Sequence, residues 1–223
     1  MIPLLNRSTR DAILQLVLSL AVAAAPATAA TISHQATFPL SPYLNFGSYA
    51  YAPASIPKFN TAGECLTSVC VRLDAGLNGT VGFENYQNFP VVVTVQYTGS
   101  VTLQRPNLTT ILTVQPSTTI TDNLPVYDNV LDYGGPSGRT YPSVSALQSD
   151  SLCITTGPDL ALFSGAGNIS LPGIGTDLAS QIGASSWSIG VRTYATVTVT
   201  YHSTGCATPT RRSTWGRVRT LYR

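Results

Sequence analysis

The chain has 223 residues, of which only 10% are charged, and its formal net charge at pH 7 is +2. Between Thr31 and Cys206, however, five basic residues stand against nine acidic ones, because five of the arginines lie after Cys206. A body without a basic face releases few counterions from phosphates, which argues against nucleic-acid binding. Lys58 is the only lysine, so the chain also lacks the lysine-containing loop that binds nucleotide phosphates.

The first thirty residues have the order of charged, apolar and small residues that is typical of a secretory signal peptide. Arg7 and Arg10 precede the apolar run ILQLVLSLAVAAA, and cleavage after Ala29, or alternatively after Ala30, follows a run of small residues. The apolar run is shorter than the roughly 18 residues that a membrane-spanning helix needs. We therefore expect residues 1–30 to be removed on export, and we expect no transmembrane segment in the rest.

The remaining chain alternates between apolar and polar residues with the period of two that is typical of β-strands. The clearest strands are 91–104 and 193–202, where alanine, valine and tyrosine on one face alternate with threonine and His202 on the other. Only 175–186 suggests a short helix. Shorter strands are expected, in chain order, at 33–38, 68–74, 80–85, 110–114, 118–121, 151–155, 160–163 and 168–171.

Turn signals separate these segments, among them Asn78-Gly79 and Gly157-Pro158. Many short strands joined by turns predict an all-β protein, and at this length we expect a single antiparallel β-sandwich over residues 31–206, of jelly-roll or Ig-like Greek-key type. The basic tail at 207–223 is expected to be disordered. Such a tail can also attract phosphates, anionic lipid or polyanionic glycan.

Four cysteines lie beyond the signal, and an even number in an exported chain predicts two disulfides. Spacing alone permits three pairings. We favour Cys65–Cys70 as a local clip, with Cys153–Cys206 tying a middle strand to the end of the last one. A zinc site is the weaker alternative, because Cys65 and Cys70 lack tight C-x-x-C spacing and no histidine pair lies nearby.

The residues needed for common hydrolytic mechanisms are sparse. A catalytic triad needs a positioned histidine, and His34 and His202 both lie in strand-like segments near the chain ends. Glycosidase chemistry needs two carboxylates. Glu84 follows the strand-like VGF and could be an inward acid in a carbohydrate cleft, although such a residue is more often the exposed half of an alternating strand. We expect neither catalysis nor a cofactor.

The segment DNVLDYGGPSGRTY (128–141) is the most site-like part of the chain. Asp128 and Asp132 do not have the spacing of an EF-hand calcium loop. Residues 130–133 alternate as a short strand would, and the glycines and Pro136 that follow favour a turn, across which Arg139 could pair with Asp132. We expect a structural corner, and calcium bound by Asp128, Asp132 and backbone carbonyls is the main alternative.

Aromatic residues gather in PYLNFGSYAYAP (42–53), where Tyr43, Tyr49 and Tyr51 lie among small residues. Exposed tyrosines provide contact area for carbohydrate or protein at low entropic cost. The alternative, which we favour, is that these rings plug one end of the sandwich.

The order of several segments resembles the bacterial choice-of-anchor E domain. The segments are IPKFN, NGTVGFEN, PVVVTVQYTGSVTLQRP, LDYGGPSGRTY, DLALFSGAGNISLP and ATVTVTY, and the resemblance runs from about His34 to Tyr201. It implies an exported or surface protein of a bacterium, often with a C-terminal sorting signal such as a PEP-CTERM segment, and it implies no catalytic residues. The four cysteines are not part of that pattern. The tail has terminal arginines but neither Pro-Glu-Pro nor an apolar helix, which favours free secretion or a truncated end over anchoring.

These observations predict a non-enzymatic secreted or cell-surface β-sandwich with a structural, adhesive or extracellular-matrix role. Its expected partners are extracellular polysaccharide, a cell surface, or a second copy that pairs through edge strands. The alternative is a secreted carbohydrate-binding or carbohydrate-active module, with or without calcium. That module would use the tyrosine-rich segment and one of the acids Glu84, Asp128 and Asp132.

Overall fold

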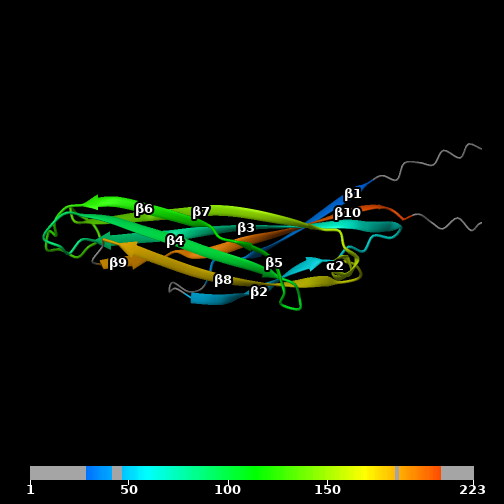
Figure 1. Cartoon of the computed structure of the whole chain (residues 1–223). Coiled ribbons are helices and arrows are strands. Elements are labelled where there is room, and N and C mark those ends of the chain that lie inside the picture. The colour runs from blue at the N-terminus through cyan, green and yellow to red at the C-terminus, as the bar shows by residue number, and fades with distance from the viewer. Residues whose placement is uncertain (1–28, 42–46, 184–185, 207–223) are drawn as a thin grey trace, which may run out of the picture.

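A computed structural model describes residues 29–41, 47–183 and 186–206 (Figure 1). Two five-stranded antiparallel sheets pack against each other. This arrangement confirms the all-β sandwich. The expected signal peptide, except for its last two residues, and the basic tail lie outside the described residues, as does Tyr43.

The two sheets divide the strands between them as follows. Sheet A has the order β1-β10-β3-β7, with β9 beside the end of β3, and consists of β1 (Ala30–Phe38), β3 (Glu64–Glu84), β7 (Gly138–Ile154), β9 (Ser186–Ile189) and β10 (Arg192–Gly205). Sheet B has the order β2-β8-β4-β5, with β6 also beside β4, and consists of β2 (Gly47–Pro57), β4 (Val91–Gln104), β5 (Thr110–Val114), β6 (Ser117–Leu124) and β8 (Asn168–Ile182). A short helix, α2 (Gly157–Leu162), connects β7 to β8. Within the described ranges, no helix has the length and apolarity needed to cross a membrane.

The alternation read from the sequence decides which side chains enter the core. In β10 the residues Ala195, Val197, Val199 and Tyr201 are buried, whereas the threonines between them are half-buried on the outer face. β4 likewise buries every second residue from Val93 to Leu103. Strand side chains point alternately to the two faces of a sheet, so one apolar face per strand is sufficient to build a two-layer core.

The interior contains two apolar clusters that follow each other along the sandwich. The first includes the segment of β3 from Val69 to Ala75, and the second includes the segment from Leu77 to Phe83. Between them the inward positions are small or polar: Gly99 of β4, Asp177 of β8 and Thr193 of β10. A Cβ atom on Gly99 would lie 2.2 Å from Thr193 Cγ2, so the two sheets can approach here only because this residue is glycine.

Several element boundaries differ from the expectation. The expected strand at 160–163 belongs instead to α2 and the residue after it, because Pro158 occupies a first-turn position where its missing N–H has no cost. The expected helix at 175–186 is wrong as well: β8 continues to Ile182, and its glycines and small residues pack between β2 and β4. The segment 130–133 forms no strand.

Several strands are longer than expected, and two others have no counterpart in the expectation. β7 spans Gly138–Ile154, where only 151–155 was expected. The segments 68–74 and 80–85 form the single strand β3, because Asn78-Gly79 makes a register irregularity rather than a turn. A Cβ atom on Gly79 would lie 2.2 Å from the Gly190 carbonyl oxygen, so this glycine allows the chain to pass closely. β2 and β9 were not foreseen, and β2 incorporates most of the tyrosine-rich segment.

All four cysteines form disulfides, but the favoured pairing is wrong. The bonds join Cys65 to Cys206 and Cys70 to Cys153, with Cα–Cα distances of 5.0 Å and 4.0 Å. Cys65 and Cys70 both lie in β3, where five residues of extended chain span roughly 16 Å. That separation exceeds the ~7 Å limit for a disulfide. Cys70 instead lies directly opposite Cys153 in the register of β3 and β7.

Candidate functional site

Two loops lie at the end of the sandwich that is opposite to the described chain ends (Figure 1). Residues 85–90 connect β3 to β4, and residues 125–137 connect β6 to β7. We call these two loops together the distal loop cluster. At the opposite end, Ala30 of β1 pairs with Ser203 of β10, and the Cys65–Cys206 disulfide is located there. The distal loop cluster contains most of the segment 128–141 that the sequence singled out.

The buried side chain of Asn85 holds the two loops together. Its Nδ2 donates to the carbonyls of Phe89 (3.0 Å) and Pro125 (2.7 Å), and its Oδ1 accepts from the backbone N–H of Gln87 (2.8 Å). Its own backbone N–H donates to the carbonyl of Ser137 at 2.9 Å. Each of these bonds satisfies a polar group that water would otherwise have to solvate, so the loops are held in one arrangement.

Glu84 is fully buried beneath the distal loop cluster. The Ser137 hydroxyl donates to Glu84 Oε1 at 2.5 Å, while Oε2 has no hydrogen-bond partner among the described residues. A Cβ atom on Gly138 would lie 2.4 Å from Oε2 and 2.5 Å from the Gly134 nitrogen. Glu84 is therefore an inward acid, as the less favoured expectation had it. The carboxylate is closed off from solvent and cannot contact a polysaccharide.

Asp128 and Asp132 each stabilise a turn of the longer loop. Asp128 Oδ1 accepts from the N–H of Val130 at 2.9 Å, and Asp132 Oδ1 accepts from the N–H of Gly134 at 2.7 Å. These are the short-range bonds by which aspartate favours turns over regular structure. Left-handed backbone at three nearby residues completes the corner: Asn129 (φ 70°), Tyr133 (φ 54°) and Gly135 (φ 59°).

Arg139 contacts a different acid from the one expected. Its Nε lies 3.3 Å from Asp122 Oδ2 of β6, and its Nη1 donates to the carbonyls of Gly135 and Gly138. The expected pair with Asp132 is wrong, because the Asp132 carboxylate faces its own turn. Tyr141 also donates to Asp122 Oδ2, at 3.1 Å. The Arg139 guanidinium thus connects the turn around Gly135 to β6 of sheet B.

Large apolar side chains are exposed around this corner. Val130 and Leu131 are about half exposed (52% and 50%), and Phe89 of the other loop is 54% exposed. Tyr86 and Val126 are also exposed, and the rings of Tyr86 and Tyr127 meet edge to face at 4.9 Å. Exposed apolar side chains concentrated on two adjoining loops are typical of a contact surface.

The same end of the sandwich is acidic. Burial raises the pKa of the Tyr127 hydroxyl, and a neighbouring tyrosine and three acids raise it further: Tyr86, Glu84, Asp128 and Asp132. The structure therefore brings Glu84, Asp128 and Asp132 to one end of the molecule. Within the described ranges, no three His, Cys, Asp or Glu side chains form a group that could hold a metal ion.

The tyrosines expected as possible glycan contacts lie elsewhere. Tyr49 and Tyr51 are buried in the first apolar cluster, where Tyr51 stacks on Phe38 at 4.8 Å. Their placement fits the packing interpretation and not the contact interpretation. Their hydroxyls hydrogen-bond to each other at 3.1 Å, and Tyr51 also contacts Thr193 Oγ1 at 3.2 Å.

Another buried acid is Asp177, to which the sequence analysis gave no role. It is buried between the two apolar clusters, where its Oδ2 accepts from the Ser41 hydroxyl at 3.3 Å. Burial raises the pKa of Asp177, and hydrogen bonds from Thr193, Ser41 and Tyr49 oppose that rise. The alternation of residues along the strand could have located it, because Asp177 is an even number of residues from Ile169 and Leu171 and shares the inward face of β8 with them.

Comparisons with known proteins give no family for this chain. No family model and no curated protein matches it. Solved structures that align with it include the infectious bursal disease virus Gx strain, with 12% identity, 82% coverage of this chain, 37% coverage of that chain and a TM-score of 0.21. The infectious bursal disease virus VP2 subviral particle aligns with 12% identity, 79% and 41% coverage and a TM-score of 0.15. The chain thus spans less than half of these proteins, and TM-scores this low carry no argument about function.

Proposed function

We propose that this protein is an exported, non-enzymatic β-sandwich that uses the distal loop cluster to contact an extracellular surface. The observation that carries the proposal is that the two ends of the sandwich differ. The described chain ends and both disulfides lie toward one end of β3, whereas Tyr86, Phe89, Val126, Val130 and Leu131 are exposed at the other. A domain attached to a support through either terminus would present this apolar surface outward.

The disulfides and the buried acid support two parts of this proposal. Two disulfides are typical of oxidising compartments outside the cytosol. Glu84, beneath the distal loop cluster, is closed off by Gly138 and so cannot serve as one of the two accessible carboxylates that glycoside hydrolysis requires, while Asp128 and Asp132 each accept a backbone hydrogen bond in their own turn. A structural or adhesive role therefore fits the site better than catalysis.

We further propose membership of the choice-of-anchor E family, with a bacterial origin. Two of the segments that carry the resemblance, NGTVGFEN and LDYGGPSGRTY, lie far apart in sequence but meet at the contact of Glu84 with Ser137 and Gly138. A shared packing contact is a physical reason for both segments to keep their residue types.

The test compares the binding of labelled protein to bacterial cells and to purified extracellular polysaccharide. The double variant V130S/L131S is expected to lose affinity about tenfold, because truncating two central apolar contacts costs on the order of 1.4 kcal/mol or more. L178S is the matched control, since Leu178 is an exposed leucine (63%) on the outer face of sheet B, away from the loops. Equal binding by both variants would overturn the proposed contact surface.

The second candidate is a carbohydrate-binding module, favoured by the acids Asp128 and Asp132 beside the Tyr86–Tyr127 pair. Carboxylates and aromatic rings are the groups that commonly bind sugar hydroxyls and sugar faces. A glycan array read with calcium and with a chelator separates this candidate from a general apolar contact. Binding that D128N/D132N abolishes and V130S/L131S retains would favour the module, and a reducing-sugar assay would detect any hydrolysis.

A further inference from the structure

The edge of sheet A formed by β7 is open along most of its length. Among the described strands only β3 pairs with β7, and their register is unbroken from Ile154 to Val144. Every residue from Ser145 to Cys153 is exposed except Ala146, which is half-buried. The exposure includes the inward face: Leu152 lies opposite the fully buried Val71 and is still 38% exposed. β7 therefore extends beyond the cover that sheet B provides.

The other edges of the two sheets are short or interrupted. β5 has five residues, and β2 has a register break between Tyr51 and Ala54. β6 has eight residues, and Tyr141 and Arg139 of β7 bind the carboxylate of its Asp122. β1 has only nine residues. An exposed, regular edge strand is a template for pairing with another chain, and β7 is the longest one here.

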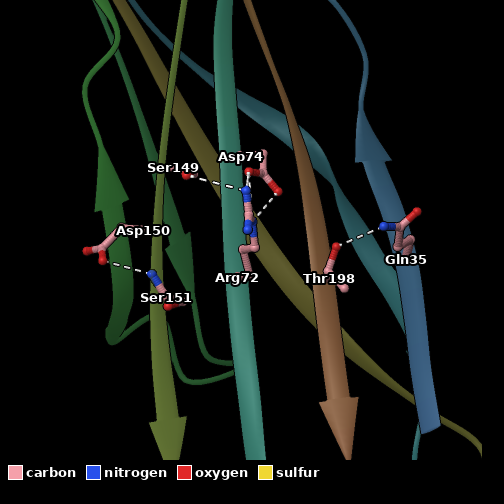
Figure 2. Close-up of polar contacts among 7 residues, drawn as sticks. All are labelled: Gln35, Arg72, Asp74, Ser149, Asp150, Ser151 and Thr198. Atoms are coloured by element: carbon pink, nitrogen blue, oxygen red, sulfur yellow. Dashed lines mark hydrogen bonds and ion pairs between the residues drawn. The ribbon is translucent and has the colours of Figure 1, made fainter.

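Asp150 shows which backbone groups of β7 face outward. Its Oδ1 accepts from the N–H of Ser151 at 2.8 Å, on the side of β7 that faces away from β3 (Figure 2). Because N–H groups alternate between the two sides of a strand, the N–H groups of Ser149 and Leu147 also point outward.

We propose that a second copy of this chain pairs with β7 along this edge, antiparallel and with a two-fold axis at Ser149. This register places Gln148 opposite Asp150, Ala146 opposite Leu152 and Val144 opposite Ile154, each of them twice. The amide of Gln148 donates to the carboxylate of Asp150, and the apolar residues of the inward face cover one another.

Neighbouring registers do not give this match. A shift of one residue would place Asp150 opposite Ser149 of the second copy and Ala146 opposite its Cys153. Because side chains alternate between the two faces of a strand, that shift would also join the inward face of one copy to the outer face of the other. The pairing of Gln148 with Asp150 and of the apolar residues with one another therefore belongs to one register.

In this register the Asp150 carboxylate and the Ser151 N–H each exchange their contact with one another for a partner on the second copy. Asp150 leaves the N–H of Ser151 and accepts from Gln148 of the second copy, and the freed N–H of Ser151 donates to the carbonyl of Leu147 of that copy. The sheets of the two copies then form one continuous sheet across the axis. This inference does not depend on the distal loop cluster. The pairing uses residues 144–154 of β7, whereas the cluster consists of residues 85–90 and 125–137 and remains accessible in the pair.

The test measures self-association by sedimentation velocity as a function of concentration, on the chain exported from a host that forms both disulfides. S149P removes an outward N–H without touching a bond to β3 and is expected to abolish pairing. S149A, which keeps the N–H, is expected to retain it. Thermal unfolding by circular dichroism shows whether S149P is folded.

Two further variants test the register and do not rely on proline. Q148E places like charges opposite each other twice and is expected to weaken pairing about tenfold, whereas Q148K faces Asp150 and is expected to strengthen it by a similar factor. A monomer at every concentration would overturn the inference. So would self-association that S149P leaves intact, or an equal response to Q148E and Q148K.

Discussion

The Ser137 hydroxyl donates to the buried carboxylate of Glu84 at 2.5 Å and joins two segments that are 53 residues apart in the sequence. The same hydroxyl accepts from the backbone N–H of Asp128 at 3.3 Å. One side chain therefore links the end of β3, the longer loop of the distal loop cluster and the start of β7. The arrangement of the exposed residues above it depends on this contact.

Removing that hydroxyl is expected to destabilise the protein. S137A leaves Glu84 Oε1 without its donor, and an unsatisfied buried acceptor costs about 1–3 kcal/mol. The free energy of unfolding, measured by urea denaturation, should fall by that amount. S143A, at an exposed serine of β7, serves as the control and should change it by less than ~0.5 kcal/mol. Equal effects of the two substitutions would contradict this role of Ser137.

A side chain at Gly138 should destabilise the protein. A Cβ atom there would meet Glu84 Oε2 at 2.4 Å and the backbone of Gly134 at 2.5 Å and 2.6 Å, and the backbone cannot move aside as a flexible side chain can. G138A is expected to cost about 1–3 kcal/mol through overpacking. G157A is the matched control, because a Cβ atom at Gly157 has nothing within 4 Å. Comparable melting temperatures for the two variants would show that the corner can relax.

Asp177 should make stability depend on pH. Burial raises its folded-state pKa above the ordinary value of 3.8. A carboxyl with a raised folded-state pKa contributes its full stability below the unfolded pKa and loses that contribution as the pH rises through the folded pKa. The free energy of unfolding should therefore fall, relative to that of D177N, from pH 3.8 upward until Asp177 is ionised. Urea titrations across acid and neutral pH measure the difference, and a difference that does not vary with pH would contradict the prediction.

The observed disulfide pairing can be checked by removing the bonds in pairs. The double variants C65A/C206A and C70A/C153A each delete one intact bond, and loss of a native disulfide typically costs about 2–5 kcal/mol. Each pair should be less stable than the wild type and should contain no free thiol. Pairs designed on the wrong connectivity, such as C65A/C70A, should leave the two remaining cysteines, Cys153 and Cys206, unpaired. Thiol titration of the folded protein distinguishes these outcomes.

Much of the fold follows from local pattern. The bounds of β4 and β5 agree with the expected strands at 91–104 and 110–114, because strict alternation and flanking turn residues are local signals. β10 was predicted for the same reason. The missed helix α2 shows the limit of this reasoning, since a short apolar run can form either a strand or a helical turn.

The candidate site was only partly predictable, because its contacts are long-range. Asp128 and Asp132 were recognised, and their turn role was the favoured interpretation. Nothing local shows that Glu84 lies inward beneath Ser137, and nothing local shows that β3 runs unbroken through Asn78-Gly79. The wrong disulfide pairing has another cause: Cys65 and Cys70 were expected to flank a short loop, whereas β3 begins at Glu64 and holds both cysteines in extended chain.

The Cys65–Cys206 bond has a mechanical consequence. Cys206 directly follows β10, and Cys65 lies at the start of β3, the strand that borders β10, β7 and β9. Tension applied to the chain beyond Cys206 would pass through the sulfur bridge into the central strand of the sheet. β10 would not be peeled away one hydrogen bond at a time, and the load would be shared by neighbouring strands in shear.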